Sequence, residues 1–513
     1  MTKSADTAAA WDRLNGLPRV SLGDLFAAAS NRVDAFTLRL EWPGAEGETG
    51  GMLVDFSKTH LSPDALDAFE ALAAASGFDA ARDALFSGGI VNPTEGRAAN
   101  HGAMRGSGTD ADTEEAAALL ARMGMLVDAI HDGVLGDVKH LIHIGIGGSA
   151  LGPALAVDAL TRDLAKVDVH VVSNIDGLAL EQAFAACDPQ TTMIAVASKT
   201  FTTIETMTNA ASALAWLEKE GVEDPSGRVI ALTASPERAV EWGVDETRVL
   251  PFPESVGGRY SIWSSIGFPI ALAIGMEEFR EFLSGAQAID THFRDAQGRA
   301  NAPLMAAFAD QYYSRLRGCQ TRAVFAYDER LALFPDYLQQ LEMESNGKSV
   351  TVDGEPVGVA TAPITWGGVG TDAQHAVFQL LHQGTHLVPV DFIAAIAPGD
   401  ALDPAHHRTL LMNCLAQGAA LMAGQESAED AARAYPGDRP STTFLLDDLD
   451  AAALGAMVAF HEHRTFANAV LMGINPFDQF GVELGKAIAK QIDAGEGDFD
   501  ASTKALMSAA GLS

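Results

Sequence analysis

Cysteines, long apolar runs and basic residues are all scarce in this sequence, and each scarcity excludes a class of protein. The 513 residues include 3 cysteines, Cys187, Cys319 and Cys414, which are far apart and odd in number. Such usage argues against a disulfide framework and favours a reducing compartment. The three cysteines also lack the spacing that is typical of zinc ligands.

No apolar run reaches the roughly 18–20 residues that a membrane-spanning helix needs, and residues 1–6 lack the apolar core of a secretory signal. With 34 lysines and arginines against 68 aspartates and glutamates, the formal net charge is −34. The phosphates of nucleic acids and anionic membranes would be repelled, so neither is an expected partner. An anionic metabolite would need a local site of backbone amides and a few placed cations.

The chain is too long for one hydrophobic core, and its pattern predicts two related α/β units. Residues 1–112 have helical stretches such as 62–76 and few strand signals. Strands and helices then alternate in two rounds, which implies parallel sheets covered on both faces. The predicted strands are 138–146, 167–173, 192–197, 228–233 and 248–251 in the first round and 323–327, 387–392 and 443–446 in the second. Between the rounds a junction is expected near 278–300, and helices over 451–473 and 476–493 precede a polar, weakly patterned tail.

A glycine-rich stretch, Gly-Ile-Gly-Gly-Ser-Ala-Leu-Gly at 145–152, follows a predicted strand and opens a helix. Its glycines let the backbone approach an anion, and the helix N-terminus offers free N–H groups. The pattern also fits a variant of the dinucleotide fingerprint. Taken alone, the stretch leaves a dinucleotide site, a sugar-phosphate site around Gly148 and Ser149, and a simple tight turn all open.

A second stretch of this kind, Ser-Lys-Thr-Phe-Thr-Thr at 198–203, also follows a strand and opens a helix. A helix cap needs one hydroxyl, whereas Ser198, Thr200, Thr202 and Thr203 supply four beside Lys199. Because both stretches follow strand C-termini, they can converge on one crevice. Two anion loops favour a single phosphate over a dinucleotide.

Glu344 is the candidate general base. It lies in the last turn of a helix that is predicted to end at a left-handed Asn346–Gly347 cap, where the negative end of the helix dipole should raise its pKa. Gln340 lies one turn earlier on the same face. Arg259, which follows Gly258 in a glycine turn, is a permanent cation that could stabilise an oxyanion.

Two further helices contain candidates for proton transfer and binding. His375 lies in the first turn of a helix over about 372–383, where the positive dipole end should keep its imidazole neutral and suit it to shuttle a proton. The second helix is predicted to begin at Pro476 with an Asn475 cap, which places Gln479 and Lys486 on one face.

Together these stretches resemble the glucose-6-phosphate isomerase (phosphoglucose isomerase) family over about residues 92–486. The most specific matches are four. They are Gly-Arg-Tyr-Ser-Ile-Trp-Ser at 258–264, Met-Glu-Ser-Asn-Gly-Lys at 343–348, Gln-His at 374–375 with His-Gln-Gly-Thr at 382–385, and Phe-Asp-Gln-Phe-Gly-Val-Glu-Leu-Gly-Lys at 477–486. The resemblance implies an α/β fold of two sugar-isomerase (SIS) type three-layer α/β/α domains with parallel-rich sheets, plus N-terminal and C-terminal helical extensions. The implied parts are an extension over 1–112 that packs on the second domain, a first domain over 113–280, a second over 281–495 and a tail over 496–513.

The resemblance also implies residue roles. Carried over by motif, Glu344 resembles the base that moves a proton between C2 and C1, and Arg259 the group that faces the enediolate oxygen. His375 resembles the ring-opening residue, with Lys486 as a partner in that step and Glu205 as the acid that orients the histidine. The remaining positions resemble phosphate- or substrate-binding residues: Gly148, Ser149, Ser198, Lys199, Thr200, Thr203, Gly258, Gln340 and Gln479.

The implied activity is the reversible isomerisation of glucose 6-phosphate and fructose 6-phosphate, in glycolysis and gluconeogenesis, by a cytoplasmic homodimer whose sites are each completed by a histidine of the neighbouring subunit. This chemistry needs no cofactor and no metal. Two alternatives remain: a nicotinamide-dependent oxidoreductase that uses 145–150, and a non-catalytic regulator that binds sugar phosphates. The first leaves Glu344 and Lys486 without roles, and the second needs the anion loops but no base.

Overall fold

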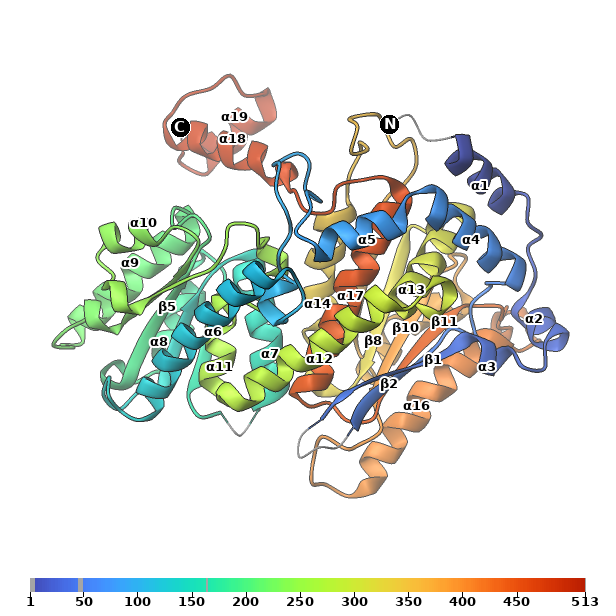
Figure 1. The fold of residues 1–513 in the computed structure, drawn as a ribbon, viewed down its shortest axis with the longest axis horizontal. Helices are drawn as coiled ribbons and strands as arrows, with labels where there is room; N and C mark the ends of the chain where they lie inside the picture. The colour runs from blue at the N-terminus through green and yellow to red at the C-terminus, as the bar shows by residue number, and fades with distance from the viewer. Residues whose placement is uncertain (1–4, 45–48, 163–164, 513) are drawn as a thin grey trace. The chain divides into compact units, whose positions relative to one another are not determined.

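The computed structural model describes residues 5–44, 49–162 and 165–512. Contacts divide the chain into a compact unit of residues 1–476 and a small C-terminal unit of residues 477–513. The compact unit contains two separate sheets, one with β5 and the other with β8 and β10 (Figure 1). The predicted α/β class is confirmed.

The first sheet has the strand order β4-β3-β5-β6-β7 and is parallel throughout. Helices α8 (Gly177–Ala186), α9 (Ile204–Lys219) and α10 (Pro236–Trp242) bury apolar side chains against one face. Alternate strand residues such as Leu141 and Met193 are also buried, and α6 (Asp110–His131), α7 (Leu151–Thr161) and α11 (Phe268–Ile274) contact the strands. Both faces are therefore covered, as a parallel sheet requires. The strands are β3 (His140–Ile144), β4 (Asp168–Val172), β5 (Thr192–Ala197), β6 (Val229–Thr233) and β7 (Val249–Pro251).

The second sheet has the order β1-β2-β11-β10-β8-β9. Its parallel part consists of β8 (Thr321–Tyr327), β9 (Ile364–Val369), β10 (Val390–Ala395) and β11 (Ser441–Leu446). Helices α15 (Asp372–Gln383) and α16 (Pro404–Ala423) bury apolar residues against this part. Strand β9 was missed because its two central glycines, Gly367 and Gly368, weaken the strand pattern.

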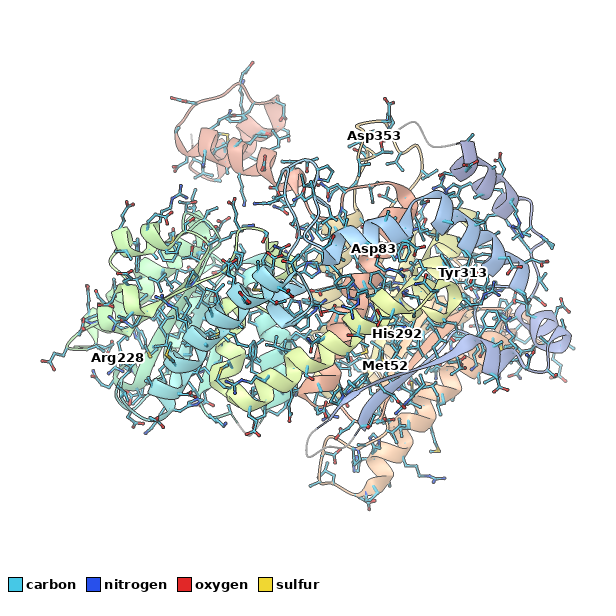
Figure 2. The ribbon with its side chains drawn as sticks, viewed as in Figure 1. Met52, Asp83, Arg228, His292, Tyr313 and Asp353 are labelled. Atoms are coloured by element: carbon cyan, nitrogen blue, oxygen red, sulfur yellow. The ribbon has the colours of Figure 1, made fainter. Side chains whose placement is uncertain are left out.

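The N-terminal extension, which is predicted to be helical with few strand signals, also contains two strands. Strands β1 (Thr37–Pro43) and β2 (Thr49–Asp55) form an antiparallel hairpin, and β2 pairs with β11. Met52 of β2, labelled in Figure 2, is fully buried in this added sheet edge. The hairpin was missed because β11, the strand that it pairs with, lies far along the sequence, and because Gly50 and Gly51 weaken the strand pattern of β2. The helices of this region are α1 (Ala5–Asn15), α2 (Leu22–Ala28), α3 (Arg32–Phe36), α4 (Pro63–Ala75) and α5 (Phe78–Phe86).

Long helices connect the two sheets. The junction expected near 278–300 lies mostly within α12 (Met276–Asp295), which packs along α17 (Ala451–Met472) through the middle of the view in Figure 1. Helices α13 (Ala302–Gln311) and α14 (Phe334–Leu338) complete the compact unit. Within the described residues, no helix combines the length and the apolar character needed to cross a membrane.

The C-terminal unit differs from prediction at both ends. Helix α18 (Glu483–Asp493) begins at Glu483 and not at Pro476, so Asn475 does not cap it. The Asn475 amide nitrogen donates to Asn92 Oδ1 at 2.9 Å and to Thr94 Oγ1 at 2.8 Å. The tail that was expected to be weakly patterned contains α19 (Ala501–Ala509). The division at residue 476 also falls inside the segment 281–495 that sequence analysis assigns to the second domain.

Candidate active site

A carboxylate and a guanidinium face each other where the two halves of the compact unit meet. Glu344 Oε2 lies 3.5 Å from Arg259 Nη1. The Arg259 side chain is 2% exposed and that of Glu344 is 23% exposed. The carboxylate can therefore be reached from solvent, while the cation behind it is held in place.

Arg259 is held by groups from two distant segments of the chain. Its Nε donates to Ser345 Oγ at 2.6 Å, and its Nη2 donates to the Pro476 carbonyl. The Tyr260 hydroxyl lies 2.9 Å from the same Ser345 oxygen, and burial raises the pKa of Tyr260, so that it stays a neutral phenol. A guanidinium with several fixed partners is held in one orientation. Sequence reasoning did not single out Ser345, although it lies inside the motif at 343–348.

Glu344 lies in the last turn of a helix that differs from the expected one. After α14 the chain forms a wider π-helical turn over Gln339–Glu344, a conformation that is frequent at functional sites. The predicted left-handed cap is wrong, because neither Asn346 nor Gly347 has a positive φ. The ammonium of Lys348 instead donates to the carbonyls of Glu344 at 2.8 Å and Ser345 at 3.0 Å and caps the helix end.

A buried anchor fixes this turn to the second sheet. Glu342 accepts hydrogen bonds from Arg322 of β8 and, at 2.7 Å, from Thr365 of β9. Burial opposes its charge, but Arg322, together with His461 and Arg464, outweighs burial and holds the pKa of Glu342 well below its usual range. A permanently ionised, buried Glu342 therefore positions Glu344, two residues later, at the surface of the site.

The first glycine loop, residues 145–152, contacts both the helix of Glu344 and the turn of Arg259. Gly147 has a φ of 57°, and a Cβ there would lie 2.9 Å from the side-chain nitrogen of Gln340. A Cβ on Gly148 would lie 2.2 Å from the Gly258 carbonyl carbon and 2.5 Å from the Arg259 nitrogen. Glycine is required at Gly148 because of this close approach. The loop, the Gln340 side chain and the Arg259 turn are thus in contact.

His143 binds the backbone of this loop from the preceding strand, β3. It is fully buried on β3, and its Nε2 lies 2.7 Å from the Ser149 carbonyl, to which the neutral ring donates. Burial lowers the pKa of His143 to about 4, so the ring stays neutral at physiological pH. Sequence reasoning missed this residue because a lone histidine in a buried strand has no distinguishing pattern.

The second loop follows β5, the neighbour of β3 in the parallel sheet, so the two loops leave the same sheet edge, as the sequence predicts. Ser198 Oγ lies 3.1 Å from Thr203 Oγ1, and Thr200 Oγ1 lies 2.8 Å from Thr202 Oγ1. The hydroxyls gather at the start of α9, a helix N-terminus that favours an anion.

Lys199 turns away from this loop. Its ammonium donates to the carbonyls of Glu254 at 2.6 Å and Val256 at 3.1 Å. These contacts tie the second loop to the segment that leads into Gly258 and Arg259. Burial, followed by the nearby Arg97, lowers the pKa of Lys199 to about 8. Lys199 therefore joins two parts of the site, and its backbone remains the group that can face an anion.

The structure does not bring every predicted residue to this place. His375 is exposed in the first turns of α15, and within the described part of the chain it has no side-chain hydrogen bond or ion pair. No hydrogen bond or ion pair among the described residues joins it to Glu205, in the first turn of α9. Gln479 and Lys486 belong to the C-terminal unit, so their contact with Glu344 stays a prediction.

In chemical terms the arrangement combines a reachable base, a fixed cation and two amide- and hydroxyl-rich loops. Such a set can bind a phosphate at the loops, remove a proton from an adjacent carbon and stabilise the oxyanion that results. None of these steps needs an electron carrier.

Comparison with known proteins agrees with this geometry. A family model described as phosphoglucose isomerase matches residues 55–507. The glucose-6-phosphate isomerases of Erythrobacter litoralis and Novosphingobium aromaticivorans are 71% identical over 510 residues and 68% identical over 503 residues, and each alignment covers 98% of both chains. The crystal structure of a glucose-6-phosphate isomerase from Chlamydia trachomatis has a TM-score of 0.87 at 28% sequence identity and covers 99% of each chain.

Proposed function

The chain belongs to the phosphoglucose isomerase family and is an aldose–ketose isomerase, and from that premise we propose that it interconverts glucose 6-phosphate and fructose 6-phosphate through an enediolate. The observation that supports this most directly is the 3.5 Å approach of Glu344 to Arg259 beside the Gly147–Gly148 turn. The two partners come from segments far apart in the sequence, and each has its own buried anchor.

In the proposed reaction the phosphate binds at the two loops, where Ser149, Ser198, Thr200 and Thr203 provide hydroxyls and the backbone provides amides. The sugar carbons then extend toward Glu344. After ring opening, Glu344 removes the proton from one of C2 and C1 and returns it to the other, so one base on one face performs both transfers. Arg259 stabilises the negative charge on the enediolate oxygen.

Ring opening requires a further acid–base group, and we assign it to His375 with Lys486 as its partner and Glu205 as the residue that orients it. The exposure of His375 on α15 supports a role in the site of a second copy of the chain. The proposed homodimer would therefore complete each site with a histidine of the neighbouring subunit. Gln340 and Gln479 would bind sugar hydroxyls, and the enzyme would act in glycolysis and gluconeogenesis, in the cytoplasm.

Replacement of Glu344 by glutamine tests the assignment. The amide keeps the shape of the side chain but does not accept the proton, so turnover should fall by orders of magnitude while the substrate still binds. Glu277→Gln, an exposed position in the first turn of α12, is the matched control and should leave turnover unchanged. Turnover of Glu344→Gln equal to that of the wild type would remove Glu344 from the mechanism.

Nuclear magnetic resonance of the reaction in D2O tests the chemistry independently. With fructose 6-phosphate as the substrate, exchange of the proton held by Glu344 should place deuterium at C2 of the glucose product. An oxidoreductase would instead need nicotinamide cofactor and change its absorbance, and a non-catalytic binding protein would form no product. Product without any deuterium, formed at an unchanged rate by Glu344→Gln, would contradict proton transfer through this carboxylate.

A further inference from the structure

A second group of reactive side chains lies on the first sheet, away from the candidate active site. His140 opens β3, His170 lies in the adjacent strand β4, and Cys187 follows α8, which covers the same sheet face. One ligand atom of each residue lies within 4.8 Å of the others. The register pairs His140 with Asp168 and Ile142 with His170, so the two imidazoles are diagonal neighbours on one face.

Two of these side chains have unsatisfied polar atoms. His140 Nδ1 and His170 Nε2 are both buried and have no hydrogen-bond partner among the residues that the structure describes. Removing an imidazole nitrogen from water without replacing its hydrogen bond costs free energy. Two such nitrogens on neighbouring strands, both close to one thiol, therefore point to a ligand that is shared by all three residues.

We propose that His140, His170 and Cys187 bind one Zn²⁺ ion. Two imidazoles and one thiolate are a donor set that zinc prefers, and water or Asp168, whose Oδ2 lies 3.8 Å from His140 Nδ1, would supply the fourth position. Bond lengths of roughly 2.0–2.3 Å require the three ligand atoms to move about 1 Å closer together. On binding, the Cys187 thiol gives its proton to solvent and the sulfur bonds to the metal.

The proposed site would act on stability and not on catalysis. His140 lies at the start of β3 and the phosphate loop follows its end, a separation of about 16 Å at roughly 3.3 Å per residue. Strand β4 is an edge strand of this sheet. A metal bound to β3, β4 and the end of α8 would therefore fix a sheet edge that has a neighbour on one side only.

Cobalt titration of the full-length protein after chelation tests the site, because Co²⁺ substitutes for Zn²⁺ and reports its ligands. The wild type should bind one Co²⁺ per chain with a thiolate-to-metal charge-transfer band, and Zn²⁺ should displace it. Cys187→Ser should lose the band and bind Zn²⁺ at least roughly 100-fold more weakly, the upper range for loss of even an outer-shell partner. Cys414→Ser, at another buried free cysteine, is the matched control and should keep the band.

Thermal unfolding gives a second test, which stays informative for a destabilised variant because each variant is compared with its own metal-free Tm. Zn²⁺ should raise the Tm of the wild type and of Cys414→Ser by a few degrees, and it should not shift the Tm of His140→Gln or His170→Gln relative to their own metal-free values. A wild type without the charge-transfer band, or a Zn²⁺-induced shift that survives in Cys187→Ser, would overturn the proposal. Neither outcome bears on Glu344, since isomerase activity is measured separately.

Discussion

Gly148→Ala is the most direct test of how the site is assembled. The added methyl group would lie 2.2 Å from the Gly258 carbonyl carbon and 2.3 Å from the carbonyl oxygen. Both neighbours are backbone atoms that no side-chain rotation can move. Gly148 does not have a left-handed φ, so alanine adds no backbone strain, and steric contact is the whole effect.

The expected magnitude follows from that contact. Ordinary carbon contacts begin near 3.4 Å, so the phosphate loop and the Arg259 turn must separate by about 1 Å. A displacement of about 1 Å in a catalytic arrangement can cost roughly 100-fold in rate, which corresponds to about 2.7 kcal/mol of transition-state stabilisation. Overpacking of this kind costs about 1–3 kcal/mol of folding free energy, so the variant should remain folded with a lower Tm.

Steady-state kinetics and thermal unfolding, measured on the same preparation, check this prediction. The matched control is Gly23→Ala, at an exposed position in α2 where a methyl group meets Ser21 Oγ at 3.9 Å. Alanine there should leave kcat/KM unchanged and slightly stabilise the helix. A Gly148→Ala enzyme with kcat/KM within about threefold of the wild type and an unchanged Tm would refute the close approach of the two segments.

Three further outcomes are expected. Burial lowers the pKa values of His143 and His292 to about 4, so between pH 6.5 and 4 the unfolded chain binds two protons that the folded chain does not. The free energy of unfolding from urea titrations should therefore fall with decreasing pH by about 2.7 kcal/mol per pH unit from these groups, and by half of that in His143→Gln; equal slopes would contradict this. Ser345→Ala removes a hydrogen bond to the charged Arg259, worth about 1.5–3 kcal/mol, and should lower kcat/KM about 10- to 100-fold, whereas Tyr260→Phe should lower it less; the reverse order would exclude Ser345 as the positioning group. Activity should survive EDTA, and its loss with recovery on adding a divalent metal would show that the reaction needs one.

The sequence by itself determined the features that depend on residues close together along the chain. Strand β5 has the bounds that the sequence predicts, residues 192–197. The two anion loops were found because glycines and hydroxyls directly follow buried strands. Parallel strands end at one sheet edge, so the convergence of these loops follows from local pattern plus the geometry of the fold.

Only the tertiary structure decided the contacts between distant segments. The sequence does not show that β2 pairs with β11, that the Asn475 amide donates to Asn92, or that Ser345 fixes Arg259. The same holds for the imidazoles of His140 and His170, which meet because neighbouring strands place them on one face. Secondary structure depends on near neighbours that the sequence displays, whereas a partner for a polar atom is chosen by the packing of the whole chain.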